Sequence, residues 1–116
     1  MKTLFIFNDA PFSGERTYNG LRVAWALSKQ EGNSVTIFLF GDAAPSALIK
    51  QQIPQGFGDV GEMLGNVIQQ GGKVAICATC MEARNMLDND VMAGTRRGTM
   101  AELTEWIATA DKVLVY

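Results

Sequence analysis

The chain contains two cysteines, Cys77 and Cys80, which stand three positions apart in the stretch KVAICATC. Thiolates act as nucleophiles, as metal ligands and as redox partners, so this spacing is compatible with three kinds of chemistry. The pair could form a reversible disulfide, supply half of a metal site, or contain one reactive thiol beside an inactive one. A purely structural role is a fourth interpretation, because free cysteine is among the most buried residue types.

The chain contains no histidine. This removes the usual general base of Ser-His and Cys-His hydrolases and the commonest side-chain ligand of transition metals. A closed structural zinc site needs four ligands, of which Cys77 and Cys80 supply only two. Zinc would therefore require a four-thiolate site shared between two subunits. We predict neither a metal nor another cofactor.

Cys77 ends an apolar run, and the residues that follow it favour a helix beginning near Thr79. A thiol at such a junction faces free backbone N–H groups and the positive end of the helix dipole, which lower its pKa. Arg84 adds a positive charge in the same segment. Because histidine is absent, this is the evident route to an activated nucleophile. The spacing also fits a thioredoxin-type dithiol, although the motif comes late in the chain instead of near the start of a βαβ unit.

Four short apolar runs predict strands, and the segments between them predict helices. The runs are rich in Val, Ile, Leu and Phe with little alternation, which is typical of strands buried on both faces of a parallel sheet. They cover residues 3–7, 34–40, 73–77 and 112–116. The predicted helices extend from 14 to 31 with a cap at Gly32, from Asp59 to the Gly71-Gly72 pair, and onward from Thr99. Asp59 with Glu62, and Thr99 with Glu102, have capping-box spacing.

Alternating strands and helices predict an α/β domain with a largely parallel sheet, helices on both faces and right-handed crossovers. In such a sheet the functional loops gather at the carboxyl ends of the strands, where Cys77 is expected to lie. The first strand leads into the loop NDAPFSGE, which contains Asn8, Ser13, Gly14 and Glu15. Its backbone N–H groups could cradle an anion, but the loop lacks both the dinucleotide and the P-loop patterns. We interpret it as a wall of the pocket that contains Cys77.

Two segments fit this alternation less well. In residues 42–59, Asp42 is predicted to cap a short helix, and the apolar residues beyond it are interpreted as a packed surface excursion. Those apolar residues are Ile49, Ile53 and Phe57. In residues 87–98, a short additional strand is predicted near Val91.

Composition and charge exclude several classes of protein. The chain has 116 residues, of which 47 % are apolar and 19 % charged, and it is predicted to form one domain over residues 1–116. No apolar run has the length of a membrane span or a signal peptide, so we expect a cytoplasmic protein without a membrane partner. The net charge is −2, and the one adjacent basic pair, Arg96-Arg97, is interpreted as solvated loop charge. Direct nucleic-acid binding is therefore not expected.

Four stretches, taken together in their order and spacing, resemble a known family. They are NDAPFSGERTYNGLRVAWAL, FLFGDA, VAICATCMEAR and GTMAELTEWIATADKVLVY. The chain resembles the DsrE/DsrF-like sulfur-relay family and is similar to its YchN-like branch. The resemblance implies a three-layer α/β/α domain with a mainly parallel sheet of about five strands, assembled as a homotrimer or homohexamer. Trp25 and Trp106, on apolar helical faces, are interpreted as core or subunit interface.

The same resemblance implies a role for Cys77. In members that transfer sulfur, the cysteine matching Cys77 takes up sulfur as a persulfide and passes it to the next protein. We therefore expect a small sulfur-relay protein with sulfur donor and acceptor proteins as partners. Cys80 matches a second cysteine of YchN-like members and is a candidate resolving thiol. Two alternatives stay open: a thiol-disulfide oxidoreductase that uses both cysteines, and a non-catalytic oligomeric binding module with unreactive thiols.

Overall fold

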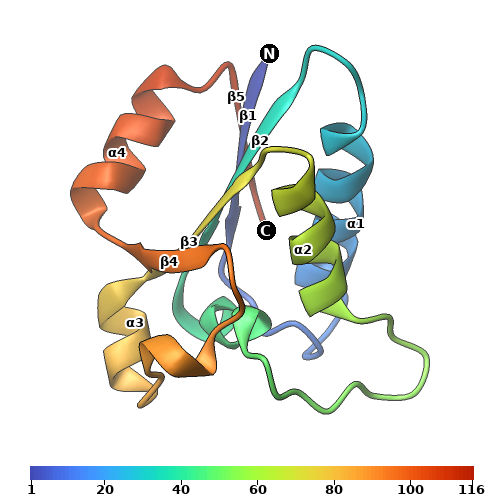
Figure 1. Ribbon diagram of the computed structural model, residues 1–116, viewed down its shortest axis with the longest axis vertical. Helices are drawn as coiled ribbons and strands as arrows, with labels where there is room; N and C mark the ends of the chain where they lie inside the picture. The colour runs from blue at the N-terminus through green and yellow to red at the C-terminus, as the bar shows by residue number, and fades with distance from the viewer.

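The computed structural model describes residues 1–116 and contains one five-stranded sheet with helices on both faces (Figure 1). The strands are β1 (Lys2–Phe7), β2 (Ser34–Leu39), β3 (Lys73–Cys77), β4 (Thr95–Gly98) and β5 (Lys112–Val115). They lie in the order β4-β3-β2-β1-β5, and each neighbouring pair is parallel. The predicted α/β fold and the four predicted strands are confirmed.

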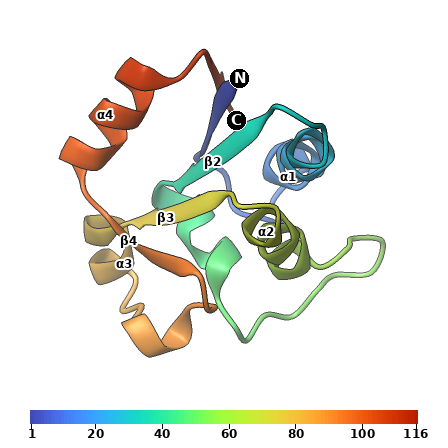
Figure 2. The same ribbon diagram turned by 45° about the horizontal axis from the view of Figure 1, so that its top comes forward.

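The long helices form two layers. Figures 1 and 2 show α1 (Arg16–Ser28) and α2 (Val60–Gln69) on one face of the sheet and α4 (Met100–Thr109) on the other. Near the carboxyl ends of the strands lie α3 (Ala78–Ala83) and the 3₁₀ helix η1 (Gly41–Ala47), and a second 3₁₀ turn, η2 (Asp88–Asp90), precedes β4. None of the helices has the length and apolar character that a membrane span requires.

Two helix starts were predicted from their capping residues, and both are confirmed. The Asp59 side chain accepts a hydrogen bond from the Glu62 N–H at 3.2 Å, one residue before α2 begins. The Thr99 side chain accepts one from the Glu102 N–H at 3.2 Å in front of α4. Such caps satisfy backbone donors that the first helical turn leaves free, which is why the signal is readable from local sequence.

The sheet separates two hydrophobic cores of unequal size. Because strand side chains alternate between faces, Phe5 and Phe7 of β1 face α1 and α2, whereas Leu4 and Ile6 face α4. The core on the α1 and α2 side contains 18 buried residues. The α4-side core contains six, namely Leu4, Ile6, Phe38, Ala75, Cys77 and Leu103. Cys77 therefore belongs to the smaller core.

Helix α1 is shorter than the helix predicted over 14–31. It begins at Arg16 and ends at Ser28. The backbone N–H groups of Lys29 and Gln30 then donate to Ala26 and Leu27 at 3.3 and 3.1 Å, which closes the last turn. Gly32 lies farther along, in the turn before β2, and its φ of +82° suits glycine. The prediction that Gly32 caps the helix was wrong.

The additional strand predicted near Val91 is present as β4, but it begins later in the chain, at Thr95. Val91 forms only an isolated antiparallel bridge with Leu48. Strand β4 includes Arg96 and Arg97, so the interpretation of these arginines as loop charge was wrong. Arg96 pairs with Glu102, and Arg97 pairs with Asp88 at 2.6 Å and with Glu82 at 3.7 Å. A short edge strand with two charged residues lacks the apolar run by which the other strands were recognised.

The segment between β2 and α2 also differs from its prediction. Asp42 lies inside η1 instead of capping it, because the helix begins at Gly41 and Phe40, two residues before Asp42, takes the capping position. Ile49 and Ile53 are exposed, as expected for a surface excursion, and Phe57 packs edge-on against Phe12 and Tyr18.

Strand β5 is present as predicted, but it is not buried on both faces. It lies at the edge of the sheet and pairs only with β1. Its residues Val113 and Val115, which are in register with Leu4 and Ile6, are 38 % and 64 % exposed. Ile107 of α4 is also exposed, so apolar side chains remain uncovered on the α4 side. Burial of this strand could not be predicted, because an apolar edge strand has the same sequence pattern as a central one.

Candidate functional site

Cys77 and Cys80 lie at the junction of β3 and α3. Cys77 is the last residue of β3, and its Sγ accepts a hydrogen bond from the Cys80 N–H at 3.4 Å, which caps α3. The hydroxyl of Thr79 lies 3.3 Å from the same sulfur. The apolar run up to Cys77 forms the strand, and the buried Met81 anchors the short helix that follows. The helix predicted near Thr79 is present and begins at Ala78.

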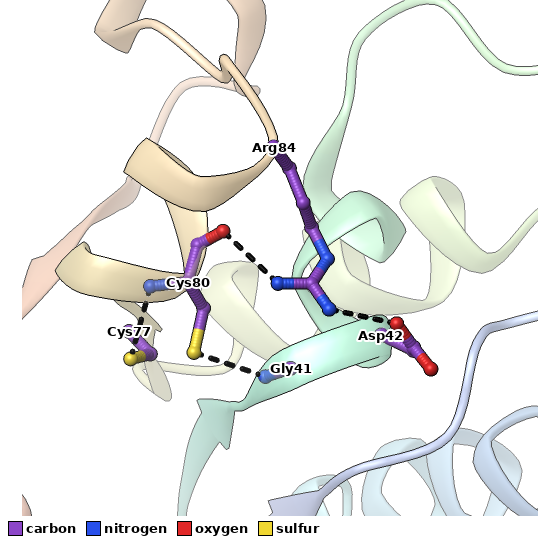
Figure 3. Close-up of polar contacts among 5 residues, drawn as sticks. All are labelled: Gly41, Asp42, Cys77, Cys80 and Arg84. Atoms are coloured by element: carbon purple, nitrogen blue, oxygen red, sulfur yellow. Dashed lines mark hydrogen bonds and ion pairs between the residues drawn. The ribbon is translucent and has the colours of Figure 1, made fainter.

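The Cys80 sulfur lies between the Cys77 side chain and η1 and faces Gly41 (Figure 3). Gly41, the first residue of η1, donates its backbone N–H to Cys80 Sγ at 3.1 Å. Gly41 has a φ of +51°, a conformation that glycine adopts without steric cost. Both cysteines are free thiols in this arrangement. A direct attack of one thiol on the other therefore requires Cys80 to leave Gly41.

Arg84 lies beside Cys80 and contacts two elements. Its Nη1 donates to the Cys80 carbonyl oxygen at 3.2 Å, and its Nη2 donates to Asp42 Oδ1 at 2.7 Å (Figure 3). Sequence reasoning placed Arg84 near the thiols but missed Gly41 and Asp42. A signal for both residues was present in the sequence, because they directly follow β2. Adjacent parallel strands end at the same edge of a sheet, so residues that follow β2 can lie beside residues that follow β3.

The pKa values of the two thiols shift in opposite directions. Burial raises the pKa of the Cys77 thiol, but hydrogen bonds from Cys80 and Thr79 outweigh burial and hold this pKa below its usual value. Burial is also the largest influence on Cys80 and, with the hydrogen bond to the Cys77 side chain, raises the pKa of Cys80. The Gly41 N–H and the Arg84 charge oppose that rise without cancelling it. Cys77 is therefore the better thiolate of the pair.

The pH dependence of alkylation should reveal this difference. Only thiolate reacts with iodoacetamide, so labelling of Cys77 should reach its half-maximal rate at lower pH than labelling of the denatured chain. Labelling of Cys80 should reach its half-maximal rate at higher pH than the same reference. Brief labelling across a pH series, followed by peptide fragmentation to assign the labelled residue, measures both midpoints. Coinciding midpoints would contradict the opposite shifts.

The first loop is not linked to the thiols by any hydrogen bond or ion pair. Asn8 is exposed and donates from its backbone N–H and from Nδ2 to the Tyr116 carbonyl at 2.8 and 3.1 Å. Ser13, Gly14 and Glu15 are exposed. Hydrogen bonds thus connect Cys77, Cys80 and Arg84, and these bonds do not include the four predicted loop residues.

Metal-ligating side chains do not gather into a site within the chain. No group of three or more Cys, Asp or Glu side chains is arranged to hold an ion. The two thiols supply at most two ligands, and Cys80 Sγ is directed at Gly41. A closed zinc site would need further ligands from outside the subunit.

Comparisons of the sequence identify related proteins along its whole length. The profile of the DsrE/DsrF-like family matches residues 1–116. Protein YchN of Escherichia coli K12 is 34 % identical over 116 residues, which cover 99 % of this chain and 98 % of YchN. Uncharacterized protein MJ0989 of Methanocaldococcus jannaschii is 33 % identical over 116 residues, which cover 100 % of both chains.

Comparison of the structure agrees with that of the sequence. The crystal structure of YchN from E. coli matches with a TM-score of 0.92 at 33 % identity, covering 100 % of this chain and 99 % of the other. MTH1491 of Methanobacterium thermoautotrophicum, a protein of unknown function, matches with a TM-score of 0.68 at 11 % identity over 92 % and 87 % of the two chains. The second likeness shows a shared fold alone. The chain belongs to the DsrE/DsrF-like family, a family associated with sulfur relay.

Proposed function

We propose that this protein is a sulfur-relay carrier that accepts and passes on sulfur as a persulfide on Cys77. The observation that carries the proposal is the Cys77 sulfur at the carboxyl end of β3, where it accepts the Cys80 N–H and lies beside the Thr79 hydroxyl. Burial raises the pKa of the Cys77 thiol, but a hydrogen bond from the Cys80 side chain and these contacts together lower it, which favours thiolate without a histidine base. Membership of a family associated with sulfur relay supports the same conclusion.

The chemistry requires two thiolate displacements. The Cys77 thiolate attacks the terminal sulfur of a donor persulfide, so that a Cys77 Sγ–S bond forms, the donor S–S bond breaks and the donor leaves as thiolate. An acceptor thiolate then attacks the terminal sulfur on Cys77, and Cys77 leaves as thiolate. A lowered pKa helps the second step, because a more acidic thiol is the better leaving group.

Burial of Cys77 restricts which molecules can take part. The residue is only 8 % exposed, so a donor or acceptor has to present its reactive sulfur at the junction of β3 and α3. This favours transfer to and from specific donor and acceptor proteins, which we propose as partners. Free thiols in the chain suit the reducing conditions of the cytoplasm, where we place the protein.

Intact-protein mass spectrometry after incubation with a persulfide donor tests the proposal. The parent protein should gain one sulfur atom, and a thiol reductant should remove it. A loss of two hydrogens without added sulfur would instead indicate a Cys77–Cys80 disulfide and support a thiol-disulfide oxidoreductase. An unchanged mass would overturn the carrier function and leave a binding role.

We further propose that the protein assembles as a homotrimer or homohexamer. The support lies on the α4 side, where Val113, Val115 and Ile107 are exposed and Trp106 is only partly buried. Exposed apolar side chains on an edge strand and on the neighbouring helix are features that subunit contacts cover in symmetric oligomers.

A further inference from the structure

We propose that Asp42 is a positioning residue for Cys80: through Arg84, it holds the Cys80 thiol against Gly41, which must release that thiol before it can attack a persulfide on Cys77. Hydrogen bonds within the chain give the positions of Asp42, Arg84 and Cys80. The consequence for sulfur transfer rests on the function proposed above.

Four residues form a closed ring of contacts between η1 and α3 (Figure 3). Cys80 takes part twice, since its Sγ accepts from the Gly41 N–H at 3.1 Å and its carbonyl oxygen accepts from Arg84 at 3.2 Å. Arg84 also donates to Asp42 at 2.7 Å, and Asp42 follows Gly41 in the chain. The ion pair therefore ties together the two elements that carry the sulfur and its hydrogen-bond donor.

The fold places these elements beside each other. η1 follows β2, α3 follows β3, and the two strands are neighbours, with Leu39 opposite Ile76 near their ends. Arg84 lies at the end of α3, where an arginine can reach back to a carbonyl of the last turn. One planar guanidinium group can thus hold the Cys80 carbonyl and the Asp42 carboxylate together, which a lysine ammonium does less well.

Exposure makes Asp42 suitable for a test. The Arg84 side chain is 31 % exposed, whereas that of Asp42 is 75 % exposed. An ion pair with one well-exposed member contributes little to global stability, because water and salt screen it. Removing the Asp42 charge should therefore change the position of Cys80 without unfolding the protein.

The ring protects a persulfide from the second cysteine. A free Cys80 thiolate can attack Sγ of the Cys77 persulfide, which forms a Cys77–Cys80 disulfide, breaks the bond to the outer sulfur and releases hydrosulfide. The outer sulfur is then lost instead of passed on. While Cys80 Sγ is bound to the Gly41 N–H, that attack first requires the hydrogen bond to break.

The test compares the lifetime of the persulfide in Asp42→Asn with that in the parent protein. Asparagine keeps the size of aspartate but removes its charge. Glu105→Gln is the matched control, since Glu105 is an exposed carboxylate without an ion-pair partner. After loading and removal of the donor, mass spectrometry follows loss of the sulfur and formation of the disulfide.

The Asp42→Asn protein should lose its persulfide sulfur roughly fivefold faster than the parent protein, the factor that corresponds to about 1 kcal/mol. Arg84→Lys should behave similarly.

A Cys80→Ser background separates positioning from a general structural effect. Without the attacking thiol, adding Asp42→Asn should leave the persulfide lifetime unchanged. The proposal is overturned if Asp42→Asn matches the parent protein, or if it shortens the lifetime equally in the Cys80→Ser background.

A second measurement does not depend on sulfur transfer. In a Cys77→Ser protein, Asp42→Asn should speed alkylation of Cys80, because the thiol is released from Gly41. If the parent protein takes up no sulfur, the carrier function fails, yet this alkylation result still decides the role of Asp42. An unchanged alkylation rate would show that Asp42 does not position Cys80.

Discussion

A Cys77→Ser variant should take up no sulfur from a persulfide donor, whereas Cys80→Ser should take up one sulfur atom as the parent protein does and retain it longer. A serine hydroxyl does not ionise near neutral pH and cannot form the S–S bond that stores the transferred atom. Cys80→Ser removes the thiol that can expel the sulfur but keeps the backbone N–H that donates to Cys77 Sγ. Intact-protein mass spectrometry of the three proteins, treated in parallel, measures uptake and retention.

The control for these variants is the folded state. Serine is close to cysteine in size and can still accept the Cys80 N–H, so Cys77→Ser should stay folded, although its buried hydroxyl lowers the thermal unfolding midpoint slightly. Uptake by folded Cys77→Ser would move the acceptor role to Cys80. Equal retention by Cys80→Ser and the parent protein would remove Cys80 as a resolving thiol.

Val115→Lys should dissociate the proposed homo-oligomer into monomers. Val115 is 64 % exposed in the isolated chain and lies beside the exposed Val113 on the edge strand β5. A lysine placed in an apolar subunit interface would lose its hydration without gaining a partner, which costs several kcal/mol. Light scattering at matched concentration measures the mass of the parent protein and of the variant.

The matched control is Val23→Lys, because Val23 is 45 % exposed on α1, which covers the opposite face of the sheet. Val23→Lys should keep the parent mass. Dissociation by Val23→Lys alone would place the interface on the α1 side. A parent protein that is monomeric at micromolar concentration would contradict the assembly itself.

Local sequence signals were sufficient to predict most of the fold. Runs of Val, Ile, Leu and Phe indicated four strands, and Asp59 and Thr99 marked two helix starts through hydrogen bonds that span three positions. Cys77 could be assigned to a strand end for the same reason, because the apolar run stops there and helix-forming residues follow. Features of this kind depend on neighbours in the chain and are therefore readable without tertiary structure.

The sequence by itself thus determined the α/β alternation, the place of Cys77 at a strand end and the absence of a histidine base. Only the tertiary structure decided that Cys80 turns toward Gly41, 39 positions away, and that Arg84 meets Asp42 across 42 positions. It also decided that β5 is an exposed edge strand. The physical reason is that hydrogen bonds between distant segments, and the burial that shifts a pKa, depend on which strands become neighbours in the sheet.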